Sequence, residues 1–286
     1  MVAGLDAAWD GSFLPERSAG RQVHGIWVWK SSSVLKAPAS IEALLGFCQS
    51  GGINEVYIST SEELSVESGR TRITDVIALF HQSNIRVDAL LSSTNADMPG
   101  KPREKLLVHV HEIIRFNQRH LTTRFDGIHL DIEPQQRMEN KGDGNLQFLP
   151  DLVNTFRAVR VLAESRGLMV DADIQVKLLK GQIDDRRMLL SALPRLTLMM
   201  YERSSLEDGP SRKTAKLIKA GREFLDLAYA GLDGPDLAKM SIALRTADYG
   251  DSLPTMLKAL DEAFGANPHY LGWARHSYND ILRTVE

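Results

Sequence analysis

The sequence predicts a single (β/α)8 barrel, and three observations support this fold class. The chain has 286 residues, a length that suits one barrel or one doubly wound sheet. Hydrophobic residues make up 43% and charged residues 25% of the chain, as in an ordinary folded domain. From residue 24 onwards, short apolar runs alternate with longer amphipathic stretches eight times, which is the pattern of a barrel.

Each apolar run is short enough to be one buried strand of a parallel sheet. The eight runs are Gly25–Trp29, Glu55–Ser59, Arg86–Leu91, Phe125–Glu133, Met169–Lys177, Leu196–Tyr201, Met240–Arg245 and Tyr270–His276. An open doubly wound sheet is the alternative, but no glycine-rich dinucleotide or phosphate loop follows the first run. We expect residues 24–286 to form the barrel and residues 1–23, which lack periodicity, to form an N-terminal loop or cap.

The stretches between the runs have helical periodicity. Ser40 is a candidate N-cap for the first helix, and Gly51 and Gly52 are typical of its end. In the later stretches, apolar residues recur three and four positions apart, as on one face of a helix. These residues are Leu106, Leu107, Val110, Ile113 and Ile114, then Leu149, Leu152, Val153, Phe156 and Val159, then Leu217, Ile218, Phe224 and Leu225, and finally Leu257, Leu260 and Phe264.

Composition excludes several classes of protein. The 34 Lys and Arg against 37 Asp and Glu give a net charge of -3, which argues against a nucleic-acid binder. The single cysteine, Cys48, excludes an internal disulfide and a cysteine-based zinc cage. No apolar run approaches the roughly 20 residues of a membrane span. If Met1 is the native start we expect a cytoplasmic protein, and a secreted or periplasmic one if a leader was removed; oligomeric state is left open.

Several runs are polar at every second position, which is unusual for buried parallel strands. Side chains alternate faces along a strand, and the apolar face should meet the helices, so the other set is expected inside the barrel. The inward positions on this reasoning are Trp27, Trp29, Tyr57, Ser59, Gly127, His129, Asp131, Glu133, Asp171, Asp173, Gln175, Lys177, Thr197, Met199, Tyr201, Ser241, Arg245, Trp273 and Arg275.

Active sites of such barrels lie at the C-terminal ends of the strands. We therefore expect one site there, formed by residues that end the runs: Glu133, Lys177, Tyr201, Arg245 and Trp273 or Arg275. Asp171 and Asp173 lie deeper in their strand, and we expect them to satisfy other polar groups inside the barrel.

The fourth run resembles the strand-four signature of the family 18 glycoside hydrolases, the chitinase-like barrels, whose pattern is DGxDxDxE. The matching residues are Asp126, Gly127, Asp131 and Glu133. His129 stands where the family has another aspartate. The sequence Met199-Met200-Tyr201 is similar to the family's Met-x-Tyr, although Glu202 follows it in place of Asp or Asn.

The resemblance implies a glycoside hydrolase of polysaccharides or oligosaccharides that needs no cofactor. Glu133 would be the general acid, with its pKa raised by the neighbouring carboxylate of Asp131. Asp131 and Glu133 lie on one strand, so neither can attack from the far side of the sugar, and the seventh run ends in Arg245, with Asp248 in the loop beyond. This favours substrate-assisted retaining hydrolysis of an N-acetylhexosamine, in which Asp131 orients the N-acetyl group and Tyr201 donates a hydrogen bond.

The substrate-binding residues follow from the same parity, with Trp273 as an aromatic floor. They are Trp27, Trp29, Tyr57, His129, Gln175, Lys177, Arg245, Trp273 and Arg275. Two alternatives remain open. A non-catalytic carbohydrate-binding barrel would use the aromatic residues alone, and a metal-dependent hydrolase would bind zinc or manganese through His129, Asp131 and Glu133. We expect no metal, and His129 hydrogen-bonded to Asp131 or Asp173.

Overall fold

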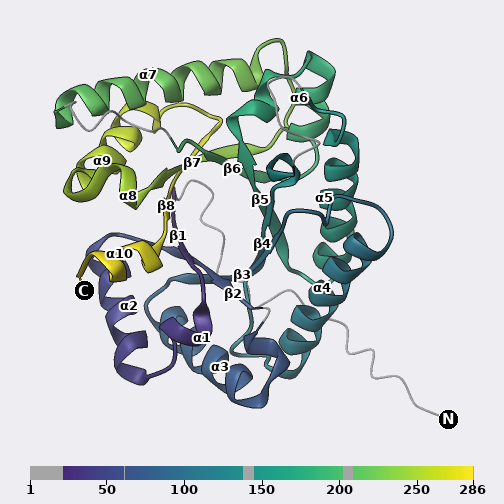
Figure 1. Cartoon of the computed structure of the whole chain (residues 1–286), viewed down its shortest axis with the longest axis vertical. Helices are drawn as coiled ribbons and strands as arrows, with labels where there is room; N and C mark the ends of the chain where they lie inside the picture. The colour runs from purple at the N-terminus through teal and green to yellow at the C-terminus, as the bar shows by residue number, and fades with distance from the viewer. Residues whose placement is uncertain (1–21, 61, 138–144, 202–208, 286) are drawn as a thin grey trace.

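The computed structural model describes residues 22–60, 62–137, 145–201 and 209–285, and its strands close into a barrel (Figure 1). Eight parallel strands pair in chain order, and β8 closes the barrel by pairing with β1. The strands are β1 Val23–Val28, β2 Glu55–Ser59, β3 Arg86–Ser93, β4 Gly127–Ile132, β5 Met169–Gln175, β6 Arg195–Met199, β7 Lys239–Arg245 and β8 Tyr270–His276. The predicted (β/α)8 fold is confirmed, and the open sheet is excluded.

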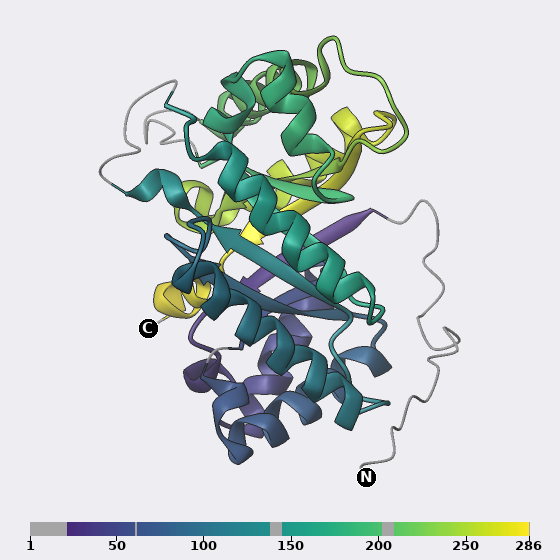
Figure 2. The same ribbon diagram turned by 90° about the vertical axis from the view of Figure 1, so that its right-hand side faces the viewer.

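Helices surround the barrel on its outer side, as the two ribbon views show (Figures 1 and 2). The α-helices are α1 Ser31–Val34, α2 Pro38–Ser50, α3 Glu67–Gln82, α4 Lys101–Arg119, α5 Leu149–Glu164, α6 Ile183–Leu190, α7 Pro210–Tyr229, α8 Thr246–Tyr249, α9 Leu253–Phe264 and α10 Tyr278–Val285. Short 3-10 helices are η1 Glu63–Ser65, η2 Pro134–Gln136, η4 Val176–Lys180 and η5 Gly250–Ser252. Helix α2 begins at Pro38 and not after Ser40, because proline fits the first turn of a helix.

The main core lies between the strands and this ring of helices. On β4 the predicted outward side chains, Ile128, Leu130 and Ile132, are buried in that core. The helical faces predicted from periodicity meet them, for example through Val110 of α4 and Phe156 of α5. The alternation of β4 therefore points its polar side chains inward, as predicted.

A second, smaller cluster fills the inside of the barrel. Its buried members are Trp27, Tyr57, Leu90, Met199, Ala243 and Ala274, with Trp29 and Tyr201 packed against them. Gly25 leaves room for this filling, because a Cβ there would lie 2.5 Å from the Tyr57 hydroxyl oxygen. The barrel is thus a packed interior, and only its ends are open to chemistry.

Two parity predictions were wrong on β8. Trp273 and Arg275 point outward: the Trp273 indole N–H donates to Asp261 of α9, and Arg275 lies over the Phe47 ring of α2. The pairing of β7 with β8 is irregular at Met240, and this shift moves the inward set by one position. The inward residues are instead Ala274 and, at the C-terminal end, His276, which lies 5.7 Å from the ring of Trp27.

Lys177 was also misplaced. Strand β5 ends at Gln175, and the chain turns into η4, which places the Lys177 ammonium 5.4 Å from the ring centroid of Phe148. The N-terminal loop or cap predicted for residues 1–23 falls almost entirely outside the described residues. Within the described ranges, no helix is both long and apolar enough to cross a membrane.

Candidate active site

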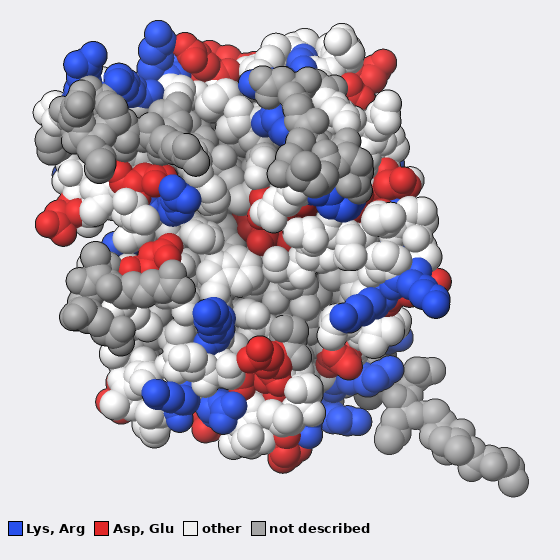
Figure 3. All heavy atoms as spheres, in the orientation of Figure 1, with Lys and Arg blue, Asp and Glu red and all other residues white. Residues whose placement is uncertain are grey.

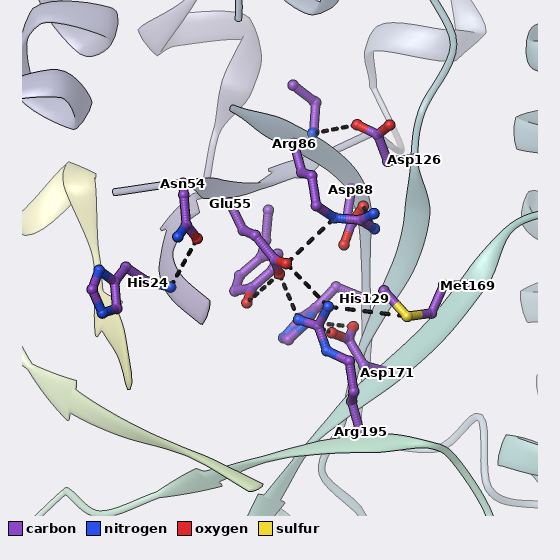
Figure 4. A network of polar contacts seen from close by, with 12 residues as sticks. His24, Asn54, Glu55, Arg86, Asp88, Asp126, His129, Met169, Asp171 and Arg195 are labelled. Atoms are coloured by element: carbon purple, nitrogen blue, oxygen red, sulfur yellow. Dashed lines mark hydrogen bonds and ion pairs between the residues drawn. The ribbon is translucent and has the colours of Figure 1, made fainter. Parts of the chain in front are cut away.

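Charged side chains form a network inside the barrel near the N-terminal ends of the strands, which we call the lower half of the interior (Figure 4). The upper half is the part near the C-terminal ends of the strands. Arg195, the first residue of β6, contacts Glu55 of β2 at 2.5 Å and Asp171 of β5 at 3.0 Å. Arg86 of β3 contacts Glu55 at 3.3 Å and Asp88 at 3.1 Å. These carboxylates are therefore paired with guanidinium groups inside the barrel.

His129 stands directly above this network and is fully buried. Its Nδ1 lies 2.8 Å from Asp171 and its Nε2 lies 3.0 Å from Asp173, while its ring stacks on Tyr57 at 3.9 Å. Burial lowers the pKa of His129, but the charges of Asp173 and Asp171 outweigh it and hold the pKa well above its usual value. The expected hydrogen bond of His129 is made with Asp171, and its contact with Asp173 is an ion pair.

Asp131 is the first carboxylate of the upper half. It is buried, and its Oδ2 accepts one hydrogen bond, from the Ser92 hydroxyl of β3, at 3.2 Å, while its Oδ1 is buried without a hydrogen-bond partner. Burial, together with the charges of Asp173 and Glu133, raises the pKa of Asp131 to about 8. Asp131 is therefore a carboxyl group that can hold a proton near neutral pH.

Glu133 follows β4 directly, at the C-terminal end of the barrel. Three amide groups donate to its carboxylate: Gln175 at 2.7 Å and Gln135 at 3.0 Å bind Oε2, and Gln136 at 2.5 Å binds Oε1. Gln175 points into the barrel, as predicted, and there it contacts the Glu133 carboxylate. Gln135 and Gln136 were not predicted, because they reach back from the η2 turn.

Tyr201 follows β6 and faces the same space. Burial, and the charges of Asp173, Asp131 and Glu133, raise the pKa of Tyr201 well above its usual value. Its phenol is thus a neutral hydrogen-bond donor beside three carboxylates from β4 and β5. The structure brings together Asp131, Glu133 and Tyr201, the three residues expected at the centre of the site.

Aromatic side chains form the opposite wall, at the ends of β1 and β8. The Trp29 indole N–H donates to His276 Nε2 at 3.1 Å, and the Tyr201 ring lies 5.4 Å from the His276 ring. Burial lowers the pKa of His276, which suits an imidazole that accepts from Trp29. His276 was not predicted as a site residue, because strict alternation along β8 placed Trp273 and Arg275 inside the barrel and His276 outside it.

Trp27 and Tyr57 are not substrate platforms. Both have 0% exposure, so neither offers a face to a sugar. The Trp27 indole N–H donates to Asp173 at 3.1 Å, and Tyr57 lies against His129 below the site. Their large rings fill the barrel interior beneath the carboxylates. Trp29, which is half-buried at the rim, keeps the accessible position predicted for it.

Arg245 ends β7 and is the remaining predicted residue at this end. Its guanidinium donates to Asp248 Oδ1 at 2.6 and 3.1 Å, and its side chain is 41% exposed. In the space-filling view down the barrel, acidic atoms are visible near the centre of the face, while most Lys and Arg atoms lie toward its rim (Figure 3). The acidic partner of Arg245 is Asp248 in α8.

The residues do not fit the metal site considered from sequence. Both nitrogens of His129 contact carboxylates, so neither is free to bind zinc or manganese alongside Asp131 and Glu133. Among the described residues, the acidic group compact enough for a cation is Glu55, Asp88 and Asp171. Those carboxylates already contact Arg86 and Arg195. The guanidinium groups of Arg86 and Arg195 therefore already supply positive charge to these three carboxylates.

No protein-family profile matches the chain, and no curated protein sequence matches it. Solved structures match in fold at low identity. A chitinase from Chromobacterium violaceum is 13% identical with a TM-score of 0.53, over 90% of this chain and 94% of that chain. A β-mannanase from the blue mussel Mytilus edulis is 12% identical with a TM-score of 0.54, over 92% and 90%. A D-psicose 3-epimerase from Clostridium cellulolyticum is 14% identical with a TM-score of 0.52, over 90% and 84%. The chain thus resembles chitinases and other sugar-acting barrels in fold.

Proposed function

We propose that the protein is a glycoside hydrolase that cleaves an N-acetylhexosamine-containing polysaccharide or oligosaccharide by substrate-assisted retention. The observation that carries the proposal is the pair Asp131 and Glu133, inward on one strand at the C-terminal end of the barrel, with the Tyr201 phenol beside them. Glycosidic cleavage needs a proton on the leaving oxygen and stabilisation of an oxocarbenium-like centre. The pair and the phenol can supply both.

Among the described residues, we find no carboxylate placed to attack from across the site, which supports a nucleophile from the substrate. Asp131 and Glu133 approach a sugar from one side, because they project from the same strand. Asp248 is the acid nearest the end of β7, and its Oδ1 is bound by Arg245. An N-acetyl group on the sugar would take the part of the missing protein nucleophile.

The electrostatics indicate which carboxylate holds the proton before substrate binds. Asp131, with a pKa of about 8, is protonated at neutral pH, while the oxygens of Glu133 accept from three amides. Transfer of that proton from Asp131 to Glu133 leaves an anion that orients the N-acetyl group and an acid that protonates the leaving oxygen. No proton is gained or lost by the pair in this step.

A non-catalytic carbohydrate-binding barrel is the second candidate, favoured by one feature. The three amide donors around Glu133 occupy both of its oxygens, which suits a carboxylate held in place rather than one that exchanges protons. The rim residues Trp29 and His276 would then bind sugar without cleavage. The two candidates differ in whether Glu133 is needed for turnover or only for the shape of the site.

Turnover of chromogenic glycosides of N-acetylglucosamine, N-acetylgalactosamine, glucose and mannose separates the candidates. We expect release of the chromophore from the N-acetyl sugars only, reduced by about 10²-fold or more in Glu133→Gln. Glu104→Gln on the exposed face of α4 is the control and should keep full activity. Calorimetric binding of chito-oligosaccharides without any turnover would favour the binding protein instead.

A further inference from the structure

Asp173 is a buried carboxylate beside the candidate site that the proposed function does not use. The β4–β5 ladder pairs His129 with Asp171 and Leu130 with Ala172, so the next inward residues, Asp131 and Asp173, lie side by side on adjacent strands. Neighbouring strands are about 4.8 Å apart. Asp173 is 3% exposed, so solvent screens little of the interaction between the two carboxyl groups.

Two side chains contact the Asp173 carboxylate, one at each oxygen. His129 Nε2 contacts Oδ1 at 3.0 Å, and the Trp27 indole N–H donates to Oδ2 at 3.1 Å. The other nitrogen of His129, Nδ1, hydrogen-bonds Asp171 at 2.8 Å, and the charges of the two carboxylates hold the pKa of His129 well above its usual value. Burial outweighs the other influences and leaves the pKa of Asp173 above its usual value, while the charge of His129 and the Trp27 hydrogen bond favour the anion. The Asp173 carboxylate is therefore contacted at both of its oxygens.

Within the part of the chain that the structure describes, no ion pair joins Asp131 to a cationic side chain. The groups that face it are Ser92 from β3, His129 and Glu133 from β4, Asp173 from β5 and Tyr201 from β6. The hydrogen bond that it accepts from a described residue comes from the Ser92 hydroxyl. After burial, the charge of Asp173 is the largest influence that disfavours the Asp131 anion, ahead of Glu133.

We propose that Asp173 is a positioning residue for Asp131: its carboxylate, contacted by His129 and Trp27, keeps the proton of the Asp131–Glu133 pair on Asp131 until substrate binds. This inference rests on the proposed function, since it concerns the same proton. It also gives His129 a part in the site. The charge of His129 favours the Asp173 anion, and His129 occupies the position where the resembled strand-four pattern has an aspartate.

The test compares Asp173→Asn with Asp171→Asn through the pH profile of kcat/KM. In the unmodified protein, activity should fall above about pH 8, where the pair loses its proton. Asp173→Asn removes the repelling charge, so Asp131 binds its proton less tightly and the alkaline limb should move about one pH unit lower, a tenfold change in proton affinity. Asp171→Asn is matched, because it removes a buried carboxylate from the other nitrogen of His129, one layer deeper, and should leave the limb in place.

Carbon-13 NMR titration of the Asp131 carboxyl group provides a second readout that needs no turnover. The titration midpoint should lie near pH 8 in the unmodified protein and fall in Asp173→Asn but not in Asp171→Asn. If no glycoside is cleaved while the midpoint behaves in this way, the proposed function fails and the inference stands. Equal shifts in the two variants, or no shift in Asp173→Asn, would overturn the inference whether or not the enzyme is active.

A double variant covers the case in which Asp173→Asn alone does not fold. His129→Asn with Asp173→Asn removes both charges of the pair and leaves Asp171 with Arg195. The midpoint of Asp131 should still fall, by less than in the single variant, because His129 opposes Asp173 in its effect on Asp131. A midpoint that stays near pH 8 or rises would exclude the assigned part of Asp173.

Discussion

The lower and upper halves of the barrel interior both contain carboxylates, but they differ in what surrounds those carboxylates. In the lower half, Glu55 and Asp171 share the guanidinium of Arg195. In the upper half, near the C-terminal ends of the strands, the described donors to Asp131 and Glu133 are hydroxyl and amide groups. The charges of His129 and Arg195 lower the pKa of Asp171 against the effect of burial, whereas burial and the neighbouring carboxylates raise the pKa of Asp131 to about 8. The comparison separates charges that support the fold from charges that can take part in chemistry.

The largest effect is expected in the lower half, on stability. Arg195→Leu leaves Glu55 and Asp171 buried without their shared guanidinium, and breaking a buried pair in this way costs about 3–5 kcal/mol. Urea unfolding measures the loss. Arg160→Leu, which breaks the exposed pair with Glu164 on α5, is the control and should change the unfolding free energy by less than about 0.5 kcal/mol. Equal stability of the two variants would mean that the buried network contributes little.

The second prediction concerns activity in the upper half. Asp131→Asn keeps the shape of the side chain and removes its ability to become an anion as charge develops on the sugar. We expect kcat to fall by about 10²-fold, with little change in KM, because the interaction is strongest in the transition state. Steady-state kinetics on an N-acetylhexosaminide measures both constants. A change confined to KM would instead place Asp131 in ground-state binding.

The same variant should alter how stability depends on pH. The folded-state pKa of Asp131 is about 8, above its usual value of 3.8, so the folded protein holds a proton that the unfolded chain releases. This proton makes stability fall as the pH rises from the lower value to the higher one. Asp131→Asn does not titrate, so thermal unfolding should show a shallower fall across that window. A slope identical to that of the unmodified protein would contradict the raised pKa.

The two halves also show how far sequence reasoning reaches. Strict alternation along β4 correctly gave the inward positions of His129, Asp131 and Glu133, because a regular strand cannot change faces. The same reasoning failed on β8, where an irregular register with β7 moves Trp273 to the outer face. The solvent exposure of inward residues was harder to predict than their direction, since nothing in the sequence shows that Trp27 is fully buried beneath the site. The hydrogen-bond partners of Glu133 could not be predicted where they come from a turn, as Gln136 does, because the path of the turn is not given by strand alternation.

The next prediction compares Trp29, at the open end of the barrel, with Trp273, on the outer face of β8. Trp29 is half-buried beside His276 at the open end, so Trp29→Ala should raise KM about tenfold, which corresponds to about 1.4 kcal/mol of binding. Trp273→Ala is the matched change on the outer face, where the indole stacks on His24 and bonds to Asp261. It should reduce stability and leave KM unchanged. Kinetics and unfolding of both variants measure this, and a raised KM in Trp273→Ala would contradict its outward position.

The smallest effect is expected at Asp248, the acid nearest the end of β7. Its Oδ1 accepts two hydrogen bonds from Arg245, and in a substrate-assisted reaction no protein carboxylate attacks the sugar. Asp248→Asn should therefore change kcat/KM by less than about threefold, against about 10²-fold or more for Glu133→Gln. Mass spectrometry of the protein mixed with a slow fluorinated glycoside provides the check. If Asp248→Asn is as damaging as Glu133→Gln and a glycosyl adduct forms on Asp248, the protein supplies its own nucleophile, and the upper half then uses carboxylates from two strands in a conventional retaining reaction.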